Sequence, residues 1–414
     1  MADTILVIDE GTTSTRSMLF AADGTCLGSE QADLEQYYPR PGWVEHDPEE
    51  IWTKSLACAR AMVERAGGAE RIAGIGITNQ RETIIFWSRS SGRALGRAIV
   101  WQDRRTADLC TRLKEAGEEA GLQERTGLLL DPYFSASKIA WAMAEWPQLK
   151  AAGNDLCIGT IESWLVFRLT GGLHVSDATN ASRTALMDIR TGLWDSALVD
   201  LFGVPPKSLP EIVDCAGPFG TALPTWLGGA IPICGMAGDQ QAAAIGQACF
   251  APGETKATYG TGAFVLTHTG ADRPVSRHRL LSTIAWQLGG AKSFAAVEQH
   301  EREFIEPKGD AIRAMLPKDK PSLILFDEVL AGLNPSEIRD VVPVIQAIRD
   351  AGVTIFLIEH VMQAVMSLAE DVYVLSGGRI IAHGAPEVIT RDETVIEAYL
   401  GQGAARKLRG RGAR

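Results

Sequence analysis

Short blocks of apolar and polar residues alternate along most of the chain, and together they predict a mixed α/β protein. Ile5–Ile8 is an apolar run that predicts a buried strand, and Met18–Phe20 begins a second strand after a polar segment. Two apolar runs around a turn rich in glycine, serine and threonine are typical of a β-hairpin. Cys26–Leu34 can supply a third strand, so the chain is predicted to open with three consecutive strands.

The next blocks have the spacing of helices and further strands. Asp47 is an N-cap candidate, and Pro48 and two acidic residues follow it, which predicts the start of a helix. The apolar side chains that this helix directs toward a core are Ile51, Leu56, Ala59, Met62 and Val63. Later strands are predicted at Arg71–Thr78, Ile84–Trp87, Ala98–Trp101 and Ile231–Cys234, and helices at Lys138–Trp146 and Ala242–Cys249.

Composition narrows the class of protein. The chain of 414 residues is long enough for about two or three domains, and its formal net charge of -11 argues against a surface that coats nucleic acid. It contains no uncharged apolar run of about 18 residues, so we expect no insertion into a membrane. Its start lacks the basic and apolar regions of a signal peptide. The seven cysteines form no CxxC pair, which favours buried free thiols in the cytoplasm.

The turn between the first two strands carries groups that suit a polyphosphate. Hydroxyls and backbone N–H groups follow the strand, and a cation lies beside them; the residues are Gly11, Thr12, Thr13, Ser14, Thr15 and Arg16. Asp9, at the end of the strand, could face Mg²⁺ directly or through water. The alternative is an ordinary solvated hairpin turn, and these residues alone do not decide between the two.

A second segment repeats this pattern and favours the phosphate interpretation. Lys256–Thr267 is again a strand, a turn of glycine and threonine, and a strand, with Thr261 in the place of the first hydroxyl cluster. Internal duplication is a stronger signal than either turn alone. Two such hairpins predict two similar domains that face one another and hold a nucleotide between them.

Two polar segments are candidates for the chemistry. Asn79–Glu82 lies between two apolar strands, where an ordinary loop competes with a site in which Arg81 and Glu82 bind hydroxyl groups as donor and acceptor. Asp239 follows a glycine at the start of a predicted helix. Transfer of a phosphoryl group to an alcohol needs a carboxylate near the attacking hydroxyl, and Asp239 suits that role. A simple N-cap aspartate is the alternative for Asp239.

Eight segments of the first part of the chain resemble glycerol kinases of the FGGY carbohydrate kinase family. The segments are DEGTTSTR, PGWVEHDPEEIW, GITNQRET, AIVWQDRRT, DPYFSASK, SDATNASRTAL, AGDQQAA and YGTGAF, within Ile5 to about Gly290. The resemblance implies the actin-like ATPase fold, which is ribonuclease H-like, with a βββαβαβα core in each lobe. It also implies transfer of phosphate from ATP to glycerol, giving ADP and glycerol 3-phosphate, with Mg²⁺ as cofactor and a homo-oligomer as an expected assembly.

The resemblance assigns roles to residues that match the family's motifs. Asp239 matches the catalytic base. The positions that bind glycerol are Arg81, Glu82, Tyr133, Asp239 and Gln240, and Trp101 and Phe264 match the apolar walls of that site. The positions that contact the nucleotide phosphates are Thr12, Thr13, Ser14, Arg16 and Thr261. Two residues depart from the pattern. Glu10 replaces the usual glutamine and would repel phosphates unless it turns away, and Glu162 replaces an aspartate.

The glycerol kinase pattern ends near Ala291, and a different resemblance follows. Leu323–Asp327 with Glu328 resembles a Walker B strand, AGLNP at Ala331–Pro335 resembles a D-loop, and His360 resembles a switch histidine. Val353–Ile358 predicts a strand and Val372–Ile381 a hairpin. This part is similar to the end of an ATPase from branched-chain amino-acid ABC transporters, in which Glu328 would polarise water and His360 would contact the γ-phosphate; Asp327 belongs to the same motif.

This chain contains only a part of each of the two proteins that it resembles. The ATPase part lacks a P-loop, because Trp286 and Ala291 stand where GxxxxGK[ST] requires glycine in the nearest candidate. Leu375–Arg379 imitates the ABC signature but comes after the Walker B strand, so we interpret it as a hairpin turn. The kinase part has only the opening strands of its second lobe, which predicts an unpaired sheet edge. Leu323–Glu328 is one surrogate partner for that edge, although nothing in the sequence requires it.

We therefore interpret the chain as a composite, which a truncating rearrangement or a fused reading frame would produce. Its predicted parts are the glycerol-binding lobe (1–250), the start of a second lobe (251–294), a junction (295–320), an ATPase-like fragment (321–402) and a basic tail (403–414). The first hypothesis is an ATP-dependent glycerol kinase with impaired turnover. The alternatives are a non-catalytic glycerol-binding remnant and, less favoured, a transporter ATPase fragment.

Overall fold

The chain folds into two compact units. The structure is a computed structural model that describes residues 3–259, 262–276, 280–301, 323–327, 335–350, 352–358, 362–376, 379–390, 392 and 394–395. The first unit comprises Met1–Pro252 and Leu266–Glu298, and the second comprises Gly253–Val265 and Gln299–Arg414.

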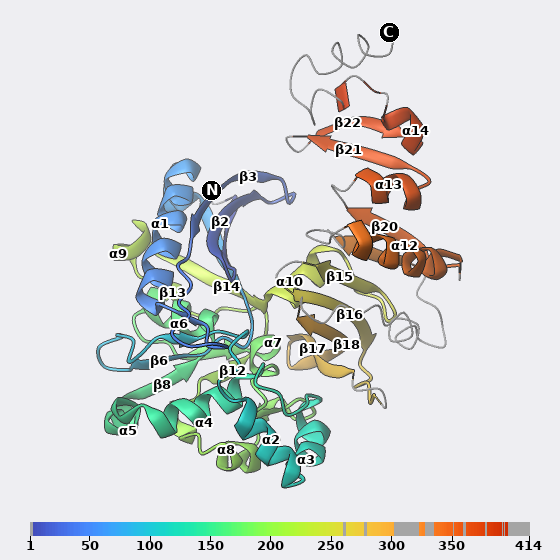
Figure 1. The fold of residues 1–414 in the computed structure, drawn as a ribbon. Helices are drawn as coiled ribbons and strands as arrows, with labels where there is room; N and C mark the ends of the chain where they lie inside the picture. The colour runs from blue at the N-terminus through green and yellow to red at the C-terminus, as the bar shows by residue number, and fades with distance from the viewer. Residues whose placement is uncertain are drawn as a thin grey trace. The chain divides into compact units, whose positions relative to one another are not determined.

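A six-stranded sheet forms the centre of the first unit (Figure 1). Its strands, in spatial order, are β13 (Thr221–Ala222), β14 (Ile231–Gly238), β5 (Ile72–Asn79), β1 (Thr4–Glu10), β2 (Ser14–Ala21) and β3 (Cys26–Asp33). The antiparallel strands β1, β2 and β3 confirm the predicted hairpin and third strand. Ile5 differs from the expected buried run, because its side chain is 43% exposed on the face opposite Leu6 and Ile8.

The three parallel strands of this sheet end together. β5 pairs in parallel with β1 on one side and with β14 on the other. In the register of these strands, Asn79 lies opposite both Glu10 and Gly238. In open α/β sheets, ligands bind beyond the carboxyl ends of parallel strands. The residues that follow β1, β5 and β14 therefore meet at the edge of the sheet where a site is expected.

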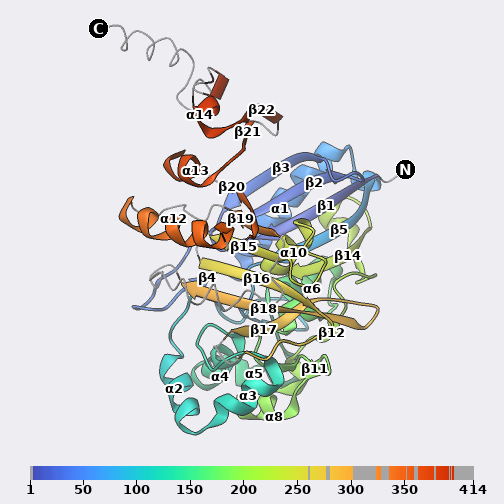
Figure 2. The same ribbon diagram turned by 90° about the vertical axis from the view of Figure 1, so that its right-hand side faces the viewer.

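Helix α1 (Pro48–Ala66) packs along one face of β1, β2 and β3 (Figures 1 and 2). The predicted N-cap is confirmed, because the side chain of Asp47 accepts a hydrogen bond from Glu49 N at 2.9 Å. The helix ends at Gly67, whose φ of 92° is a conformation that glycine adopts without strain. All five predicted core side chains of this helix are buried, and they join Leu6 and Ile8 in one apolar cluster.

The first unit contains further helices and short strand pairs. The helices are α2 (Ala107–Glu115), α3 (Glu118–Thr126), α4 (Ser135–Glu145), α5 (Pro147–Ala152), α6 (Ile161–Thr170), α7 (Ala178–Ala181), α8 (Ser196–Leu201), α9 (Pro224–Leu227) and α10 (Asp239–Gly246). Short strand pairs are β4 (Glu45–His46) with β7 (Ala98–Ile99), β6 (Ile85–Ser88) with β8 (Leu156–Gly159), β9 (Val175–Asp177) with β12 (Glu211–Val213), and β10 (Met187–Asp188) with β11 (Leu193–Trp194). β17 (Leu281–Leu288) pairs with β18 (Ala291–Glu301). The order β1–β2–β3–α1–β5–α6–β14–α10 follows the expected βββαβαβα core.

The second unit joins strands from the two dissimilar parts of the sequence. β15 (Thr255–Tyr259) is a neighbour of β16 (Gly262–Gly270), which confirms the second predicted hairpin in its strands. β15 also pairs in parallel with β19 (Leu323–Asp327), and β19 pairs in parallel with β20 (Thr354–Ile358). The prediction of an unpaired edge is therefore wrong for β15, because the backbone of the Walker B-like strand occupies that edge.

The second unit also contains helices and a further hairpin besides these strands. These described elements are α12 (Pro335–Asp350), α13 (Met362–Leu368), β21 (Val372–Ser376), β22 (Arg379–Gly384) and α14 (Pro386–Ile389). β21 and β22 form the predicted antiparallel hairpin. The turn of that hairpin, the D-loop-like segment before Pro335, the basic tail and most of the predicted junction lie outside the described residues.

Two sequence expectations about the whole chain can be compared with this structure. In the part that the structure describes, no helix is both long and apolar enough to cross a membrane. All seven cysteines are free, as predicted. Two of them, Cys26 and Cys234, are exposed instead of buried, because each lies on an uncovered position of a sheet strand.

Candidate active site

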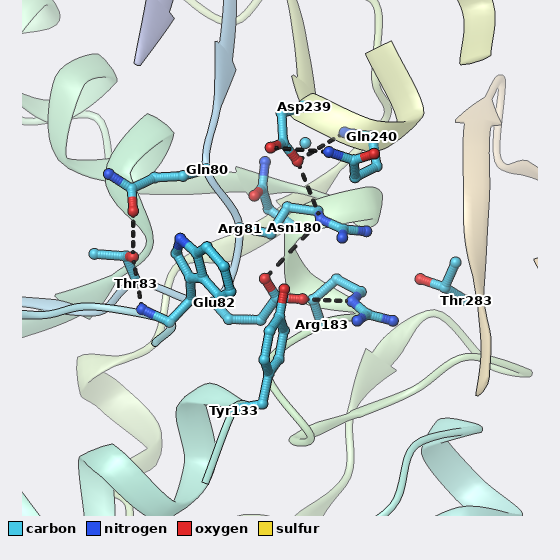
Figure 3. A network of polar contacts seen from close by, with 12 residues as sticks. Gln80, Arg81, Glu82, Thr83, Tyr133, Asn180, Arg183, Asp239, Gln240 and Thr283 are labelled. Atoms are coloured by element: carbon cyan, nitrogen blue, oxygen red, sulfur yellow. Dashed lines mark hydrogen bonds and ion pairs between the residues drawn. The ribbon is translucent and has the colours of Figure 1, made fainter. Parts of the chain in front are cut away.

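Four charged side chains converge beyond the carboxyl ends of β5 and β14 (Figure 3). Arg81 Nε lies 3.2 Å from Asp239 Oδ1 and 4.0 Å from Glu82 Oε2. Arg183 Nε donates to Glu82 Oε1 at 2.6 Å. The side chains of Arg81, Glu82 and Arg183 are almost fully buried, whereas that of Asp239 is 39% exposed. Buried charges are tolerated when they are paired, and here two arginines alternate with two carboxylates.

The charges of the carboxylates hold Arg81 in its charged form. Burial acts to lower the pKa of Arg81, but the negative charges of Glu82 and Asp239 outweigh it and raise that pKa. For Arg183, burial lowers the pKa in spite of the charge of Glu82. Sequence reasoning assigned no role to Arg183, although its segment SDATNASRTAL was one of the matching motifs. The only signal available was that match, because Arg183 is distant in sequence from its partner.

Glu82 is held in an unusual conformation. Its φ is 64°, in the left-handed region that residues other than glycine seldom adopt. Ser135 Oγ donates to the backbone oxygen of Glu82 at 3.0 Å and supports this conformation. Local strain of this kind costs on the order of 1–3 kcal/mol and often marks functional sites. Glu82 Oε2 is buried and accepts no hydrogen bond from the residues that the structure describes, so it can accept one from a ligand hydroxyl.

Tyr133 lies beside this group of charges. Its phenol is buried, and burial together with the charge of Glu82 raises its pKa well above the usual value, so the hydroxyl keeps its proton. Its ring contacts that of Trp101 with centroids 5.4 Å apart. Lys138 Nζ donates to the carbonyl oxygens of Pro132, at 2.7 Å, and of Tyr133, which fixes the loop.

Asp239 is the first residue of α10, three positions before the predicted helix start. The N-cap interpretation is wrong, because Gly238 is the N-cap residue. Asp239 Oδ1 accepts from Gln240 N at 2.7 Å, and Asp239 Oδ2 accepts from Gln240 Nε2 at 3.3 Å. A carboxylate is stabilised at a helix N-terminus by the helix dipole. The carboxylate is 39% exposed and can therefore meet a reacting group.

The turn after β1 contains two of the residues expected to contact phosphates, Thr12 and Thr13, and Ser14 follows as the first residue of β2. Gly11 N donates to Ser14 O at 2.9 Å, and a Cβ on Gly11 would lie only 3.0 Å from that same oxygen, so the tight turn favours glycine. Thr12 Oγ1 accepts from Trp101 Nε1 at 2.9 Å, and Thr13 is exposed. Arg16, on β2, donates through Nε to Gln31 Oε1 at 3.1 Å.

Glu10 turns away from this turn, so the repulsion that its charge could cause does not arise. Its side chain is fully buried toward α1, where Ser55 Oγ donates to Glu10 Oε2 at 2.7 Å. Thr15 and Ser55 hydroxyls are also 2.9 Å apart. Burial raises the pKa of Glu10 to about 8. At neutral pH a protonated carboxyl therefore takes the place of the amide that the family usually has.

A second buried network lies under the site. Glu162 Oε1 accepts from Thr160 Oγ1 at 2.5 Å and from Ser176 Oγ at 2.6 Å, and Glu162 Oε2 accepts from Asn79 Nδ2 at 3.1 Å. Burial and the charge of Asp177 raise the pKa of Glu162 to about 7. The longer acid at this position is thus fully accommodated by hydrogen bonds.

Asp9 is the one predicted metal ligand. Burial raises its pKa, and the negative charge of Asp239 raises it further. A divalent cation would relieve the repulsion between these two carboxylates, which are the ligand type that Mg²⁺ takes. Among the described residues there is no cluster of three or more histidine, cysteine or acidic side chains. The residues therefore suit a cation that keeps water and substrate oxygens as its other ligands.

The remaining predicted residues lie in the second unit or outside the described residues. Phe264 is buried in β16, in the second unit. Asp327 is the last residue of β19, in the same unit. Thr261, Glu328 and His360 lie outside the described residues. The roles expected for these five residues stay predictions.

Comparison with known proteins confirms both sequence resemblances. The profile of the FGGY family of carbohydrate kinases, N-terminal domain, matches residues 4–246. The profile named branched-chain amino acid ATP-binding cassette transporter matches residues 379–405, a smaller part than the resemblance suggested. Glycerol kinases from Cereibacter sphaeroides and Methylobacterium nodulans are 55% and 54% identical to this chain over 70% and 71% of its length.

Solved structures give the same result for the fold. The crystal structure of Plasmodium falciparum glycerol kinase with ADP has a TM-score of 0.70 and 35% identity, and it covers 82% of this chain. A xyloylose kinase from Brucella ovis, at 19% identity and a TM-score of 0.71, covers 97% of this chain and supports the fold alone. The chain spans 60% of the two bacterial glycerol kinases and 66% of the Plasmodium structure. The expected α/β, actin-like fold is confirmed, and the chain belongs to the FGGY family of carbohydrate kinases.

Proposed function

We propose that the first unit binds glycerol and that the protein transfers the γ-phosphoryl group of ATP to a terminal hydroxyl of glycerol. The observation that carries the proposal is the partly exposed Asp239 carboxylate beside the buried pairs of Arg81, Glu82 and Arg183. Relatives named glycerol kinase, and the solved relative with ADP, support ATP as donor and ADP as product.

In this proposal the side chains divide binding from proton transfer. Arg81 and Tyr133 donate hydrogen bonds to glycerol, and Glu82 Oε2 and the side chain of Gln240 complete its polar contacts. The ring of Trp101 lies against the carbon atoms. Because the phenol of Tyr133 keeps its proton, it is a donor across the physiological pH range.

The reaction needs one bond to form and one to break. The terminal hydroxyl oxygen of glycerol bonds to the γ-phosphorus, the bond between that phosphorus and the β–γ bridging oxygen breaks, and ADP leaves. Asp239 accepts the hydroxyl proton as general base. Thr12, Thr13, Ser14 and Arg16 donate to the phosphates. Mg²⁺, if held by Asp9, would supply positive charge at the phosphate oxygens.

Turnover is expected to be lower than in a longer relative. The chain covers 60% of the bacterial glycerol kinases, and the roles of Phe264 and Thr261 in the second unit remain proposals. A cytoplasmic location and a homo-oligomer also stay predictions. The non-catalytic remnant is not favoured, because the proposed base and the polyol contacts come together in one unit.

Calorimetry with glycerol, combined with an assay of glycerol 3-phosphate, tests the proposal. We expect glycerol to bind and to raise the melting temperature of the first unit by mass action. Tyr133→Phe should weaken glycerol binding about 5- to 10-fold, the scale of one lost hydrogen bond. Tyr38→Phe is the matched control, since Tyr38 is exposed and its hydroxyl donates to Gln36. An absence of binding heat and of stabilisation at high glycerol would contradict the proposal.

A further inference from the structure

A set of four hydrogen bonds joins the turn after β1 to the segment that carries Arg81 and Glu82. Gln80 Nε2 donates to Gly11 O at 2.8 Å, and Thr83 Oγ1 donates to Gln80 Oε1 at 2.9 Å. Trp101 N donates to Thr83 Oγ1 at 3.1 Å, and Trp101 Nε1 donates to Thr12 Oγ1 at 2.9 Å. Figure 3 shows the bond between Gln80 and Thr83. We call these four bonds, made by Gly11, Thr12, Gln80, Thr83 and Trp101, the bridging circuit.

The direction of every bond in the bridging circuit is fixed by chemistry. Both N–H groups of Trp101 are donors only, so Thr83 Oγ1 and Thr12 Oγ1 must accept from them. The Thr83 hydroxyl then donates to Gln80 Oε1, which leaves Gln80 Nε2 as the donor to Gly11 O. Because Thr12 Oγ1 accepts from Trp101, the Thr12 hydroxyl proton points elsewhere. The Thr12 hydroxyl is thereby set as a donor, the polarity that an anionic phosphate oxygen requires.

The bridging circuit is largely buried and flanks two of the residues proposed to bind glycerol. Gln80, Thr83 and Trp101 are buried, so a broken bond would leave an unsatisfied polar group. In sequence, Arg81 and Glu82 lie between Gln80 and Thr83, which are both in the circuit. The ring of Trp101 also contacts Tyr133. A polyol that restrains Arg81, Glu82 and Tyr133 therefore restrains the circuit as well.

We propose that the bridging circuit couples the polyol site to the phosphate-binding turn, with Trp101 and Gln80 as positioning residues. The inference rests on the proposed function, since it assumes that glycerol binds at Arg81, Glu82 and Tyr133. Glycerol holds Trp101 in place, Trp101 holds the Thr12 hydroxyl as a donor, and the turn becomes ordered before the nucleotide binds. By linkage, phosphate bound to the turn strengthens glycerol binding by the same factor.

Hydrogen exchange of the turn, with glycerol as the only ligand, tests this coupling. In the parent protein, saturating glycerol should slow exchange in the peptide covering residues 9–16 by about 5- to 150-fold, the usual range of coupling between two sites. Trp101→Phe keeps an aromatic ring but removes the Nε1–H, and should reduce this effect to less than about twofold. Thr12→Val should do the same from the other end of the bond, and the double variant should add nothing further, since both changes remove one interaction.

Two variants serve as controls. Trp194→Phe removes an equivalent indole bond elsewhere in the first unit, the one from Trp194 Nε1 to Pro210 O at 2.7 Å, and should leave the glycerol effect unchanged. Thr12→Ser keeps the hydroxyl and should preserve the coupling. If Trp101→Phe does not fold, the comparison of Thr12→Val with Thr12→Ser still tests the coupling.

Calorimetry on the same samples separates the two proposals. If glycerol gives no binding heat with the parent protein, the proposed function fails, and the coupling fails with it. If glycerol binds but exchange of the turn does not change, the coupling is overturned and the glycerol site stands. The coupling is also overturned if Trp101→Phe and Thr12→Val both bind glycerol and slow exchange as much as the parent.

Discussion

The two units of this protein differ in the origin of their sequences. In the first unit, the sheet and the proposed site come from one continuous family match over residues 4–246. In the second unit, β15 from the kinase-like part pairs with β19 from the transporter-like part. Pairing of strands requires backbone donors and acceptors in register, whereas a binding site requires particular side chains at particular places. A foreign strand can therefore complete a sheet without completing a site.

The two units also differ in how deeply the side chains of their strands are buried. Along β5 the buried positions outnumber the others, and β5 lies between β1 and β14 under a large apolar cluster. Along β20 no side chain is fully buried, and Phe356 and Ile358 are 52% and 45% exposed. We expect the first unit to be the more stable of the two, because its apolar surface is better removed from water.

The largest expected effect is on catalysis in the first unit. Asp239→Asn keeps the shape of the side chain but cannot accept a proton, so it should lower turnover by about 10²–10⁴-fold. Glycerol calorimetry on the same variant should show that the site is still present. Equal turnover of the variant and the parent would show that Asp239 is not the base.

A proline in β19 should destabilise the second unit and leave the stability of the first unit unchanged. β19 has a paired strand on each side, so Leu325→Pro removes a hydrogen bond of the sheet at a cost of roughly 3 kcal/mol, the scale of proline inside regular structure. Calorimetry should show an earlier transition for the second unit and unchanged stabilisation of the first unit by glycerol. Leu325→Val is the control that keeps a strand-forming residue. Loss of glycerol binding in Leu325→Pro would show that the units depend on one another.

Glu10→Gln should change how the stability of the first unit depends on pH. The folded pKa of Glu10, about 8, lies above its ordinary value of 4.5, so the folded state holds this proton more tightly than the unfolded state. Its contribution to stability is fully present below about pH 4.5 and is lost as the pH rises through about 8. Glutamine has no proton to lose, so the variant should lose less stability than the parent as the pH rises from 5 to 8.5.

Thermal unfolding from pH 5 to pH 8.5 measures this difference. Glu30→Gln, on exposed β3, is the control and should leave the pH dependence unchanged. A parallel pH dependence for Glu10→Gln and the parent would show that the buried carboxyl is ionised throughout.

The smallest expected effect comes from a helix cap. Asp47→Ala removes the acceptor for Glu49 N and should destabilise the first unit by about 1 kcal/mol. Asp47→Asn keeps a good N-cap and should be close to the parent. The transition of the second unit should not move with either change, and a shift of both transitions together would indicate that the chain unfolds as one cooperative body.

The parts of the fold that could be predicted depend on local signals. Asp47, Pro48 and the apolar spacing of α1 are such signals, and the structure confirms each of them. The convergence of Arg81 and Asp239 could also be predicted, since parallel strands end at one edge of a sheet. Asp239 was correctly placed at the start of a helix, but the predicted range Ala242–Cys249 begins three residues later than α10 does.

Other features of the structure could not be predicted, because no pattern among neighbouring residues in the sequence indicates them. Arg183 meets Glu82 across about a hundred residues of sequence, which no spacing rule describes. The positive φ of Glu82 is imposed by its surroundings, because the residue itself does not favour it. The pairing of β15 with β19 was one option for a free edge, and backbone complementarity alone cannot select among apolar strands.

We propose that this chain carries the residues that bind glycerol but not a complete nucleotide site. The most direct test titrates the purified protein with ATP and with GTP while glycerol 3-phosphate is measured. We predict weak nucleotide binding with little preference between adenine and guanine, and turnover far below that of a longer glycerol kinase. Tight, adenine-selective binding with ordinary kinase turnover would contradict this account, and would mean that the transporter-like strands rebuild a working nucleotide site.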